Sequence, residues 1–292
     1  MYWASYDCET EDGYELTMFR LTGLKKRKKV ADQWSKGVVL LLHGFSKDAY
    51  TWFGNRKDDD KPFLPTTLFE RGYDVWLGNV RGTRYSITHP DYDPINDNSD
   101  AKEYFDYDAT DIAKNDIPAM VKLIMDTQSE QKDKTGIPCK KISFIGHSHG
   151  AALMLASMSY TVKSDRYVSQ MIGVEPCLIS EPTSFFPYMD DNAYLLISIA
   201  ADLLEVYSMF GENWQEQIDL ICSVQGENSP ECLGLQFILQ SSGIASHPDN
   251  PWGSGEVSVK HVKHMAQMYL HNQFQEYSSW WPLSKNRKDY YL

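Results

Sequence analysis

The sequence predicts an α/β protein built on a doubly wound, mostly parallel sheet, with a helical insertion in its second half. Four apolar runs are typical of strands buried on both faces: residues 37–42, 73–79, 141–145 and 168–174. Segments with the apolar spacing of helices lie between these runs, at residues 64–71, 106–125 and 151–158. Strands that alternate with helices favour parallel pairing, because each helix carries the chain back across the sheet.

The first element is expected to be an antiparallel hairpin. Asp12 and Gly13 form a turn signal between two strand-like segments, residues 6–10 and 14–21. A basic run follows at residues 25–29. Such a run can mark a localisation signal or a patch for anionic lipid, but between two strands it favours a solvated loop.

The segment 106–125 is the longest helix expected before the third buried strand. Its apolar side chains recur at helical spacing: Ile112, Ile117, Met120, Val121 and Ile124. A stripe of this kind predicts that one face of the helix packs on the sheet.

The stretch from Gly146 to Gly150 predicts the sharp turn that presents a nucleophilic serine. It reads Gly-His-Ser-His-Gly and joins the strand 141–145 to the helix 151–158. A serine at such a turn takes a strained backbone conformation, and the two glycines prevent clashes between the neighbouring segments. The plainer alternative is a glycine-rich turn in which Ser148 only caps a helix. The strand before it and the helix after it favour the nucleophile.

The alternating pattern ends after Glu181. Residues 191–210 have helical spacing, and no strand-like run is expected in the segment that follows. We therefore expect three regions: a core at residues 1–183 that includes the hairpin, a helical lid or cap at residues 184–256, and a helix within residues 257–292 that returns to the core. A helical subdomain packed on the core and a lid that opens against apolar substrate are both compatible with this pattern.

Composition narrows the classes of partner. The chain has 292 residues and a net charge of -12, which argues against nucleic acid because phosphate binding needs a basic face. No run of 18 apolar residues predicts a membrane span. The first residues lack the pattern of a signal peptide, so we expect either a cytoplasmic protein or a sequence that starts after its signal. The five cysteines lack the spacing of a metal site.

Several ordered motifs resemble the acid lipase family of α/β-hydrolases, which includes gastric lipase and lysosomal acid lipase. The resemblance covers nearly the whole chain, and the run 72–82 is its most specific part. The other matching motifs are residues 10–14 with Arg20, residues 42–45, Tyr85 with Ser86 and His89, residues 116–119, and residues 259–264 with Gln267 and Phe274.

This resemblance implies a carboxylic ester hydrolase that acts on lipid esters, such as triacylglycerol or steryl esters, at a lipid–water interface. Ser148 would be the nucleophile, and the backbone N–H groups of Phe45 and His149 would form the oxyanion hole. The family more often has a smaller residue at position 45 and Gln at position 149; both groups act through the backbone, so these departures should be tolerated. No cofactor or metal is implied, and the family's location is lysosomal or secreted.

The base and the acid of the triad are expected to be absent from this chain. In the family both follow the lid, on loops after the last strands, and no such segment is recognisable before Leu292. We therefore expect a fragment that lacks the last two strands and leaves residues 168–174 as a sheet edge. The histidines either match non-catalytic family positions or lie in the lid region: His43, His89, His147, His149, His247, His261, His264 and His271.

Three readings of the function follow from the missing base. The chain belongs to an esterase whose sequence continues, to a catalytically silent relative that binds lipid, or to a half-enzyme completed by another chain. His147 is expected to be structural, and Glu175 is a minor candidate for the acid. If a base is present after all, His261 and His264 are the first candidates. In an exported protein we also expect a disulfide between Cys222 and Cys232.

Overall fold

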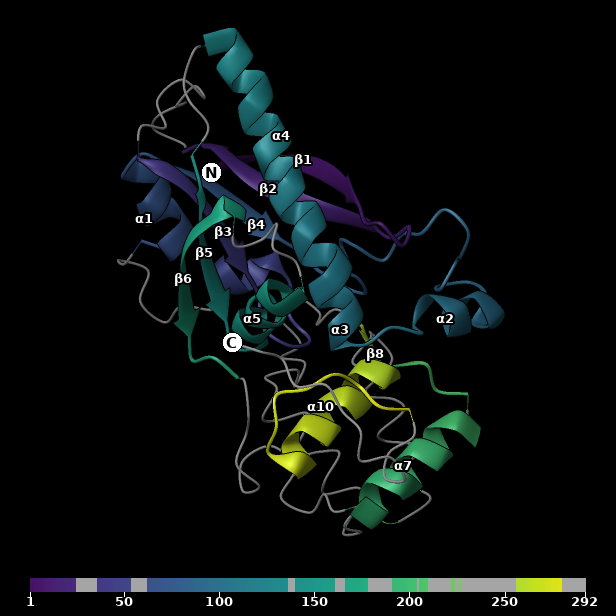
Figure 1. Ribbon diagram of the computed structural model, residues 1–292. Helices are drawn as coiled ribbons and strands as arrows, with labels where there is room; N and C mark the ends of the chain where they lie inside the picture. The colour runs from purple at the N-terminus through teal and green to yellow at the C-terminus, as the bar shows by residue number, and fades with distance from the viewer. Residues whose placement is uncertain are drawn as a thin grey trace.

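A computed structural model gives the fold of the chain. The residues that the structure describes are 1–24, 36–53, 62–135, 140–160, 166–177, 191–203, 205–209, 222–223, 226 and 256–279. The basic run 25–29, most of the expected cap and His247 lie outside them. A six-stranded sheet forms the centre, in the order β1-β2-β4-β3-β5-β6 (Figure 1).

All four apolar runs form neighbouring parallel strands, as predicted. They are β4 (Tyr73–Gly78), β3 (Gly37–Leu42), β5 (Ile142–His147) and β6 (Val168–Val174). The predicted hairpin is also confirmed: β1 (Tyr2–Glu9) and β2 (Glu15–Gly23) pair in antiparallel register. The hairpin joins the sheet through an antiparallel contact between β2 and β4.

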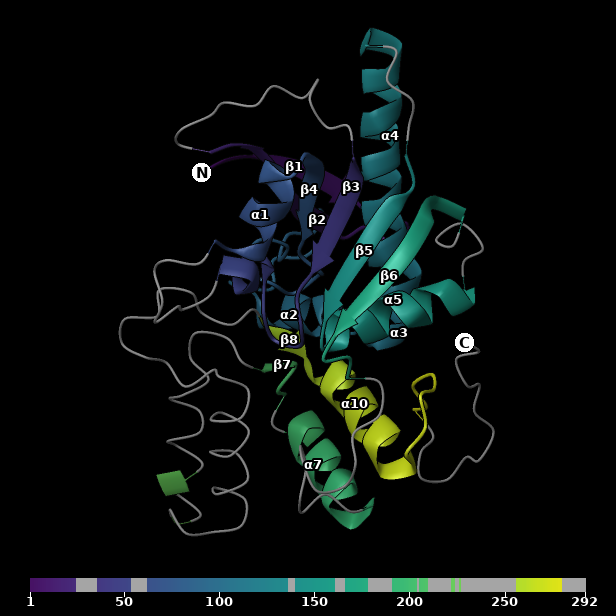
Figure 2. The same ribbon diagram turned by 90° about the vertical axis from the view of Figure 1, so that its left-hand side faces the viewer.

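Helices cover both faces of the sheet, which explains the unbroken apolar runs. In β3, Val38, Leu40 and Leu42 pack into one hydrophobic cluster with α4 (Ile117–Thr135) and α5 (His149–Tyr160). Val39 and Leu41 pack into a second cluster with α1 (Leu64–Glu70) and the short helix η2 (Ala49–Phe53). Figure 2 shows α1 on one side of the sheet and α4 with α5 on the other. The doubly wound architecture is therefore confirmed.

The helix expected at residues 106–125 has different ends. It begins with α3 (Ala109–Asp111), passes through a π-helical turn, η3 (Ile112–Asp116), and continues as α4. The start is set by Asp108, whose carboxylate accepts the Thr110 N–H at 2.6 Å, while Asp111 accepts the Asp108 N–H. The extra turns after residue 125 are rich in polar residues, so apolar periodicity did not reveal them.

A further short helix, α2 (Asn98–Tyr104), was not predicted from the sequence. Its N-cap is Asp97, whose side chain accepts the N–H groups of Ser99 and Asp100. The signal was therefore a capping residue before a helix too short to show a clear apolar period.

Two predictions for the second half need correction. The helix expected at residues 191–210 is α7 (Asp191–Leu203) and ends seven residues earlier. A strand follows where none was expected: β7 (Ser208–Met209) pairs with β8 (Val257–Ser258) in a two-stranded ribbon. The pairing joins segments far apart in sequence, so no local pattern indicates it.

The returning helix is α10 (Val259–His271), which starts directly after β8. Ser258 caps it by accepting the His261 N–H, and Asn272 ends it in a left-handed conformation. Figures 1 and 2 show α10 and α7 beyond the carboxyl ends of β5 and β6. This places α10 at the end of the sheet where parallel α/β proteins bind ligands.

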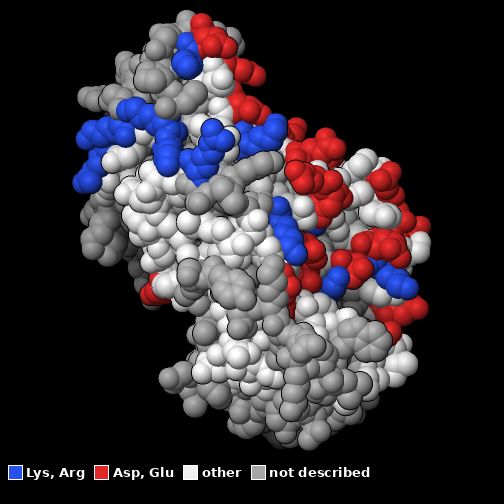
Figure 3. Space-filling view, viewed as in Figure 1, with Lys and Arg blue, Asp and Glu red and all other residues white. Residues whose placement is uncertain are grey.

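Within the described residues, β6 lies at the edge of the main sheet. Its apolar side chains are unusually exposed, with Ile172 at 48% and Val174 at 37%. Figure 3 shows few charged side chains over this part of the molecule. An apolar edge without charged residues is a place where another strand can pair.

Candidate active site

Ser148 occupies the strained turn that its sequence predicts. It lies between β5 and α5 with a φ of 51°, a left-handed conformation that is unusual for a residue other than glycine. Two backbone hydrogen bonds hold the turn: the Ser148 N–H donates to the Val174 carbonyl at 2.8 Å, and the Cys177 N–H donates to the Ser148 carbonyl at 3.2 Å. The end of β6 therefore stabilises a conformation that serine alone would disfavour.

The glycines at positions 146 and 150 are required by close packing. A Cβ atom on Gly146 would lie 2.5 Å from the Ala151 backbone nitrogen. A Cβ atom on Gly150 would lie 2.4 Å from the His43 carbonyl oxygen. Because Gly146 has no Cβ, the turn can be tight. Because Gly150 has none, α5 can approach the loop that follows β3.

The loop after β3 is held by the side chain of His43. The Val80 N–H donates to His43 Nε2 at 3.3 Å, so this nitrogen is the acceptor and Nδ1 carries the proton. Nδ1 lies 2.9 Å from the Gly44 carbonyl oxygen, to which it donates. Burial lowers the pKa of His43, which favours this neutral tautomer.

The loop after β3 and the serine turn are in contact. A Cβ atom on Gly44 would lie 3.2 Å from Ser148 Cβ, so glycine allows the loop to lie beside the serine. Phe45 follows Gly44, and its ring centroid is 5.9 Å from that of His149. The structure thus brings together Ser148 and the two residues whose N–H groups were predicted to form the oxyanion hole. His149 is also the first residue of α5, where backbone N–H groups have no partner within the helix.

Two buried histidines meet behind this turn. His149 Nε2 lies 2.8 Å from Nε2 of His261, which comes from α10. A hydrogen bond between two imidazoles needs one protonated and one unprotonated nitrogen, so one ring donates and the other accepts. The ring of Phe45 stands edge-on to both imidazoles, with its centroid 5.4 Å from that of His261.

A separate set of contacts fixes α10 to the core. His264 Nε2 lies 2.6 Å from the Gln275 carbonyl oxygen, and His264 Nδ1 lies 3.3 Å from a carboxylate oxygen of Asp108. Ser258 Oγ donates to the Tyr107 carbonyl oxygen at 2.7 Å. The returning helix α10 is therefore anchored on the segment that leads into α3.

No described histidine lies within hydrogen-bonding distance of Ser148 Oγ. His147 is half-buried, its Nδ1 has no hydrogen-bond partner among the described residues, and its ring packs on Trp52. Glu175 is exposed and has a φ of 48°. The expectation that the base and the acid are absent from this chain stays a prediction.

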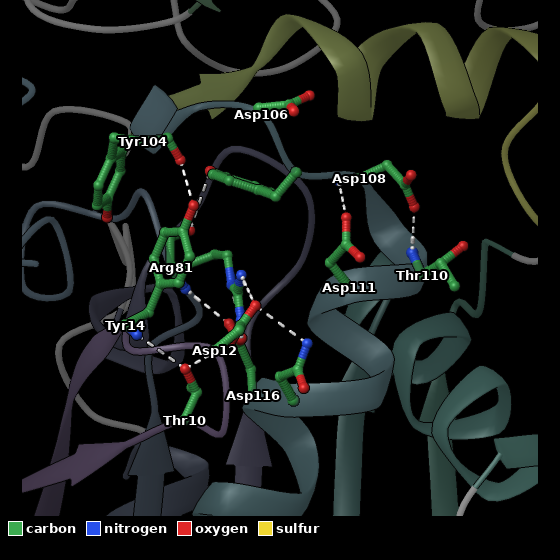
Figure 4. Close-up of polar contacts among 12 residues, drawn as sticks. Thr10, Asp12, Tyr14, Arg81, Tyr104, Asp106, Asp108, Thr110, Asp111 and Asp116 are labelled. Atoms are coloured by element: carbon green, nitrogen blue, oxygen red, sulfur yellow. Dashed lines mark hydrogen bonds and ion pairs between the residues drawn. The ribbon is translucent and has the colours of Figure 1, made fainter. Parts of the chain in front are cut away.

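A buried arginine stands beside this site. Arg81, just after β4, binds Asp12 through two N–H groups at 2.7 and 2.8 Å. Its Nε and its backbone N–H bind the carboxylate of Asp116 at 2.7 and 2.8 Å, and its guanidinium carbon lies 3.7 Å from the centroid of the Tyr14 ring (Figure 4). Burial alone would raise the pKa of Asp12, but Arg81 outweighs it and lowers that pKa below its ordinary value.

This arginine joins three parts of the chain: the hairpin turn at Asp12, the segment after β4, and the end of η3 at Asp116, directly before α4. The sequence placed Arg81 and Asp116 in family motifs but did not pair them. Their separation of 35 residues is the reason, because only contacts within a few residues can be inferred from one sequence. The His149–His261 pair, 112 residues apart, was missed for the same reason.

A cavity lies behind the loop after β3. Its walls come from that loop, from the segment around Arg81, from residues 107–112, from α5, and from residues 256–261. The lining residues are His43, Gly44, Phe45, Ser46, Lys47, Val80, Arg81, Thr83, Tyr107, Ile112, His149, Leu153, Glu256, Val257 and His261. Ser148 is not part of this lining. Phe45 and His149 are part of it, so the cavity borders both residues expected to form the oxyanion hole.

We expect the histidine pair to make the protein less stable in mild acid. Burial, with smaller effects of His264 and His43, lowers the pKa of His149 to about 3. Burial also lowers the pKa of His261 well below its ordinary value. Below the unfolded-state pKa of about 6.5 only the unfolded chain takes up these protons, so stability falls as pH falls. By pH 5 the loss from His149 alone is about 2 kcal/mol.

Urea denaturation at pH 7 and pH 5 measures this effect. Between pH 7 and pH 5 the free energy of unfolding falls in both proteins. The fall should be about 2 kcal/mol smaller in His149→Gln than in the wild type, because the variant lacks this buried imidazole. Equal losses in the two proteins would contradict the assignment of a buried, neutral His149.

Three of the cysteines lie in the part of the chain that the structure describes. Cys222 forms a disulfide whose partner lies outside the described residues, so its pairing with Cys232 stays a prediction. Cys8 and Cys177 are free.

In the described part of the chain, no three His, Cys, Asp or Glu side chains are grouped to hold a metal ion. None of the helices there has the length and apolar character needed to cross a membrane.

Comparison with known families gives two overlapping matches. Residues 37–216 match a family described as alpha/beta hydrolase fold. Residues 2–56 match a partial alpha/beta-hydrolase lipase region. The first match alone covers more than half of the chain, and it includes the loop after β3 and the serine turn.

Curated relatives are lipases by name. Gastric triacylglycerol lipase of Rattus norvegicus is 32% identical over 99% of this chain and 70% of its own length. Triacylglycerol lipase 1 of Arabidopsis thaliana is 27% identical over 94% of this chain and 65% of its own length. A probable lipase of Schizosaccharomyces pombe is 32% identical over 71% of this chain and 41% of its own length. The chain thus spans between 41% and 70% of the length of these relatives.

Proposed function

Because the chain belongs to the α/β-hydrolase fold family, in its acid lipase branch, we propose that it is a serine carboxylic ester hydrolase. Ser148 attacks the ester carbonyl and becomes acylated, the alcohol leaves, and water then releases the carboxylic acid. The observation that carries this proposal is the left-handed turn at Ser148, with the loop of Gly44 and Phe45 packed beside it.

The proposed oxyanion hole consists of the Phe45 and His149 N–H groups. A tetrahedral intermediate places negative charge on the former carbonyl oxygen, and preorganised N–H groups stabilise that charge. Each such donor lowers the barrier by about 2.7–4 kcal/mol in known hydrolases. The position of His149 at the start of α5 adds the favourable end of the helix dipole. The proposal assigns no residue to the base or the acid.

The proposed substrates are lipid esters, of which triacylglycerols and steryl esters are examples. The names of the relatives support triacylglycerol in particular. One stripe of α7 also exposes apolar side chains at helical spacing, with Leu195 at 42%, Ile199 at 46% and Leu203 at 77%. An exposed stripe of this kind supports contact of the cap with a lipid–water interface.

We place this activity in an oxidising compartment, which is the secreted or lysosomal location that the resemblance implies. The disulfide of Cys222 supports this assignment, because such bonds persist mainly in exported proteins. The same reasoning favours the predicted lid disulfide over free thiols in this region.

Labelling of the full-length natural protein with an alkyl fluorophosphonate tests the proposal. The probe should modify Ser148, identified by mass spectrometry of the peptide, and prior incubation with a triacylglycerol emulsion should slow the labelling. Modification of another serine with Ser148 untouched would reject the assignment. A protein that binds lipid but neither reacts nor hydrolyses esters would be the silent relative.

A further inference from the structure

His261 contacts both residues of the proposed oxyanion hole. Its Nε2 is 2.8 Å from Nε2 of His149, and its ring centroid is 5.4 Å from that of Phe45. Phe45 and His149 also contact each other, so three rings from three separate segments form one cluster. Phe45 comes from the loop after β3, His149 from α5 and His261 from α10.

Each contact fixes the side chain of a residue proposed for the hole. His149 and His261 are both buried, with exposures of 3% and 4%, so water cannot replace their hydrogen bond. The bond is directional and fixes the ring of His149, whose backbone N–H is one of the two donors proposed for the hole. The edge-on contact fixes the ring of Phe45 in the same way. A small shift of either ring would therefore move the backbone N–H group of the same residue.

α10 is held in place by contacts that do not involve the hole. Its first turn is joined to Tyr107 through Ser258, and its second turn to Asp108 and Gln275 through His264. The helix is therefore a fixed support, and His261 connects it to Phe45 and His149.

We propose that His261 is a positioning residue for the oxyanion hole: its contacts with His149 and Phe45 hold the two proposed donors in their working geometry. This inference rests on the proposed function, because the hole has a role only in a hydrolase. It adds to that function a mechanical link between α10 and the proposed oxyanion hole.

The link predicts a specific kinetic effect. An error of about 1 Å in a catalytic group can lower the rate about 100-fold, and loss of one oxyanion donor lowers kcat about 10²–10³-fold. We therefore expect His261→Leu to lower kcat for a short-chain chromogenic ester by about 10- to 100-fold. KM should change little, because the hole acts on the transition state and not on the bound ester.

A conservative variant and a matched control separate positioning from stability. His261→Gln places an amide near the former Nε2 and should recover most of the kcat. His264→Gln removes a buried histidine one turn away on the same helix, which loosens the anchor on Asp108 without a contact to either hole residue. It should lower the melting temperature at least as much as His261→Leu while kcat falls less.

The outcomes are distinct when measured on the full-length natural protein. Two results would overturn the inference: an unchanged kcat in His261→Leu, or a fall in kcat in His264→Gln as large as that in His261→Leu. In either case hydrolysis by the wild type would still support the proposed function. A wild type that hydrolyses no ester would overturn both. If His261→Leu does not fold, His149→Leu removes the same hydrogen bond from the other side, and the same fall in kcat is expected.

Discussion

Replacement of Ser148 by alanine is expected to lower kcat for ester hydrolysis about 10⁶-fold, as loss of the nucleophile does in other serine hydrolases. The remaining oxyanion hole and binding site would still exceed the uncatalysed rate by about 10³–10⁴-fold. Hydrolysis of a chromogenic ester by the full-length natural protein measures the loss. The substitution removes only a half-buried hydroxyl, so the free energy of unfolding should change by less than about 0.5 kcal/mol.

A control on the same helix and a second substitution sharpen this test. Ser159→Ala, near the far end of α5, should keep the full rate. Ser148→Gly should also be inactive but more stable than the wild type, because glycine adopts a φ of 51° without steric strain. Activity above 1% of the wild type in Ser148→Ala would exclude this serine as the nucleophile.

The second large effect concerns stability. Replacement of Asp116 by alanine should destabilise the protein by about 3–5 kcal/mol, since breaking a buried pair leaves a buried charge without its partner. The side chain of Arg81 is 1% exposed, and its other carboxylate partner, Asp12, is 36% exposed. Such a loss is a large part of the 5–15 kcal/mol that is typical of whole domains. Urea denaturation with linear extrapolation measures it.

The matched control lies on the same helix. Asp126 pairs with Lys122 across one turn of α4, and both side chains are well exposed. Asp126→Ala should therefore destabilise by less than about 0.5 kcal/mol. A double variant, Arg81→Met with Asp116→Leu, should be less destabilised than Asp116→Ala, because it removes both charges. A loss below about 1 kcal/mol in Asp116→Ala would show that Asp12 alone satisfies the arginine.

The strands could be predicted because their signal is local. Residues 37–42 and 168–174 are apolar throughout, and such a run reports burial whatever its neighbours are. The order of the strands could not be predicted from the same runs. Nothing in residues 14–21 indicates that β2 pairs with β4 instead of β3, since strand pairing depends on contacts across the whole domain.

In the candidate site, too, the local features could be predicted from the sequence and the long-range contacts could not. Ser148 and its flanking glycines lie within five residues, so the turn was evident from the sequence. His149 was expected to act only through its backbone, and its side chain is instead buried against His261. A histidine next to a nucleophile gives no local sign of where its ring points. The helix that meets it, α10, comes from a segment more than 100 residues away.

The strand order also bears on synthesis at the ribosome. β2 and β3 leave the ribosome one after the other, but β4 lies between them in the sheet. The hairpin of β1 and β2 therefore has no neighbour to pair with until residues 73–78 have emerged. Arg81 then needs both Asp12, made long before, and Asp116, made later. A translational pause before residue 73 would leave β2 as an open edge, and nascent chains are most prone to aggregate in that interval.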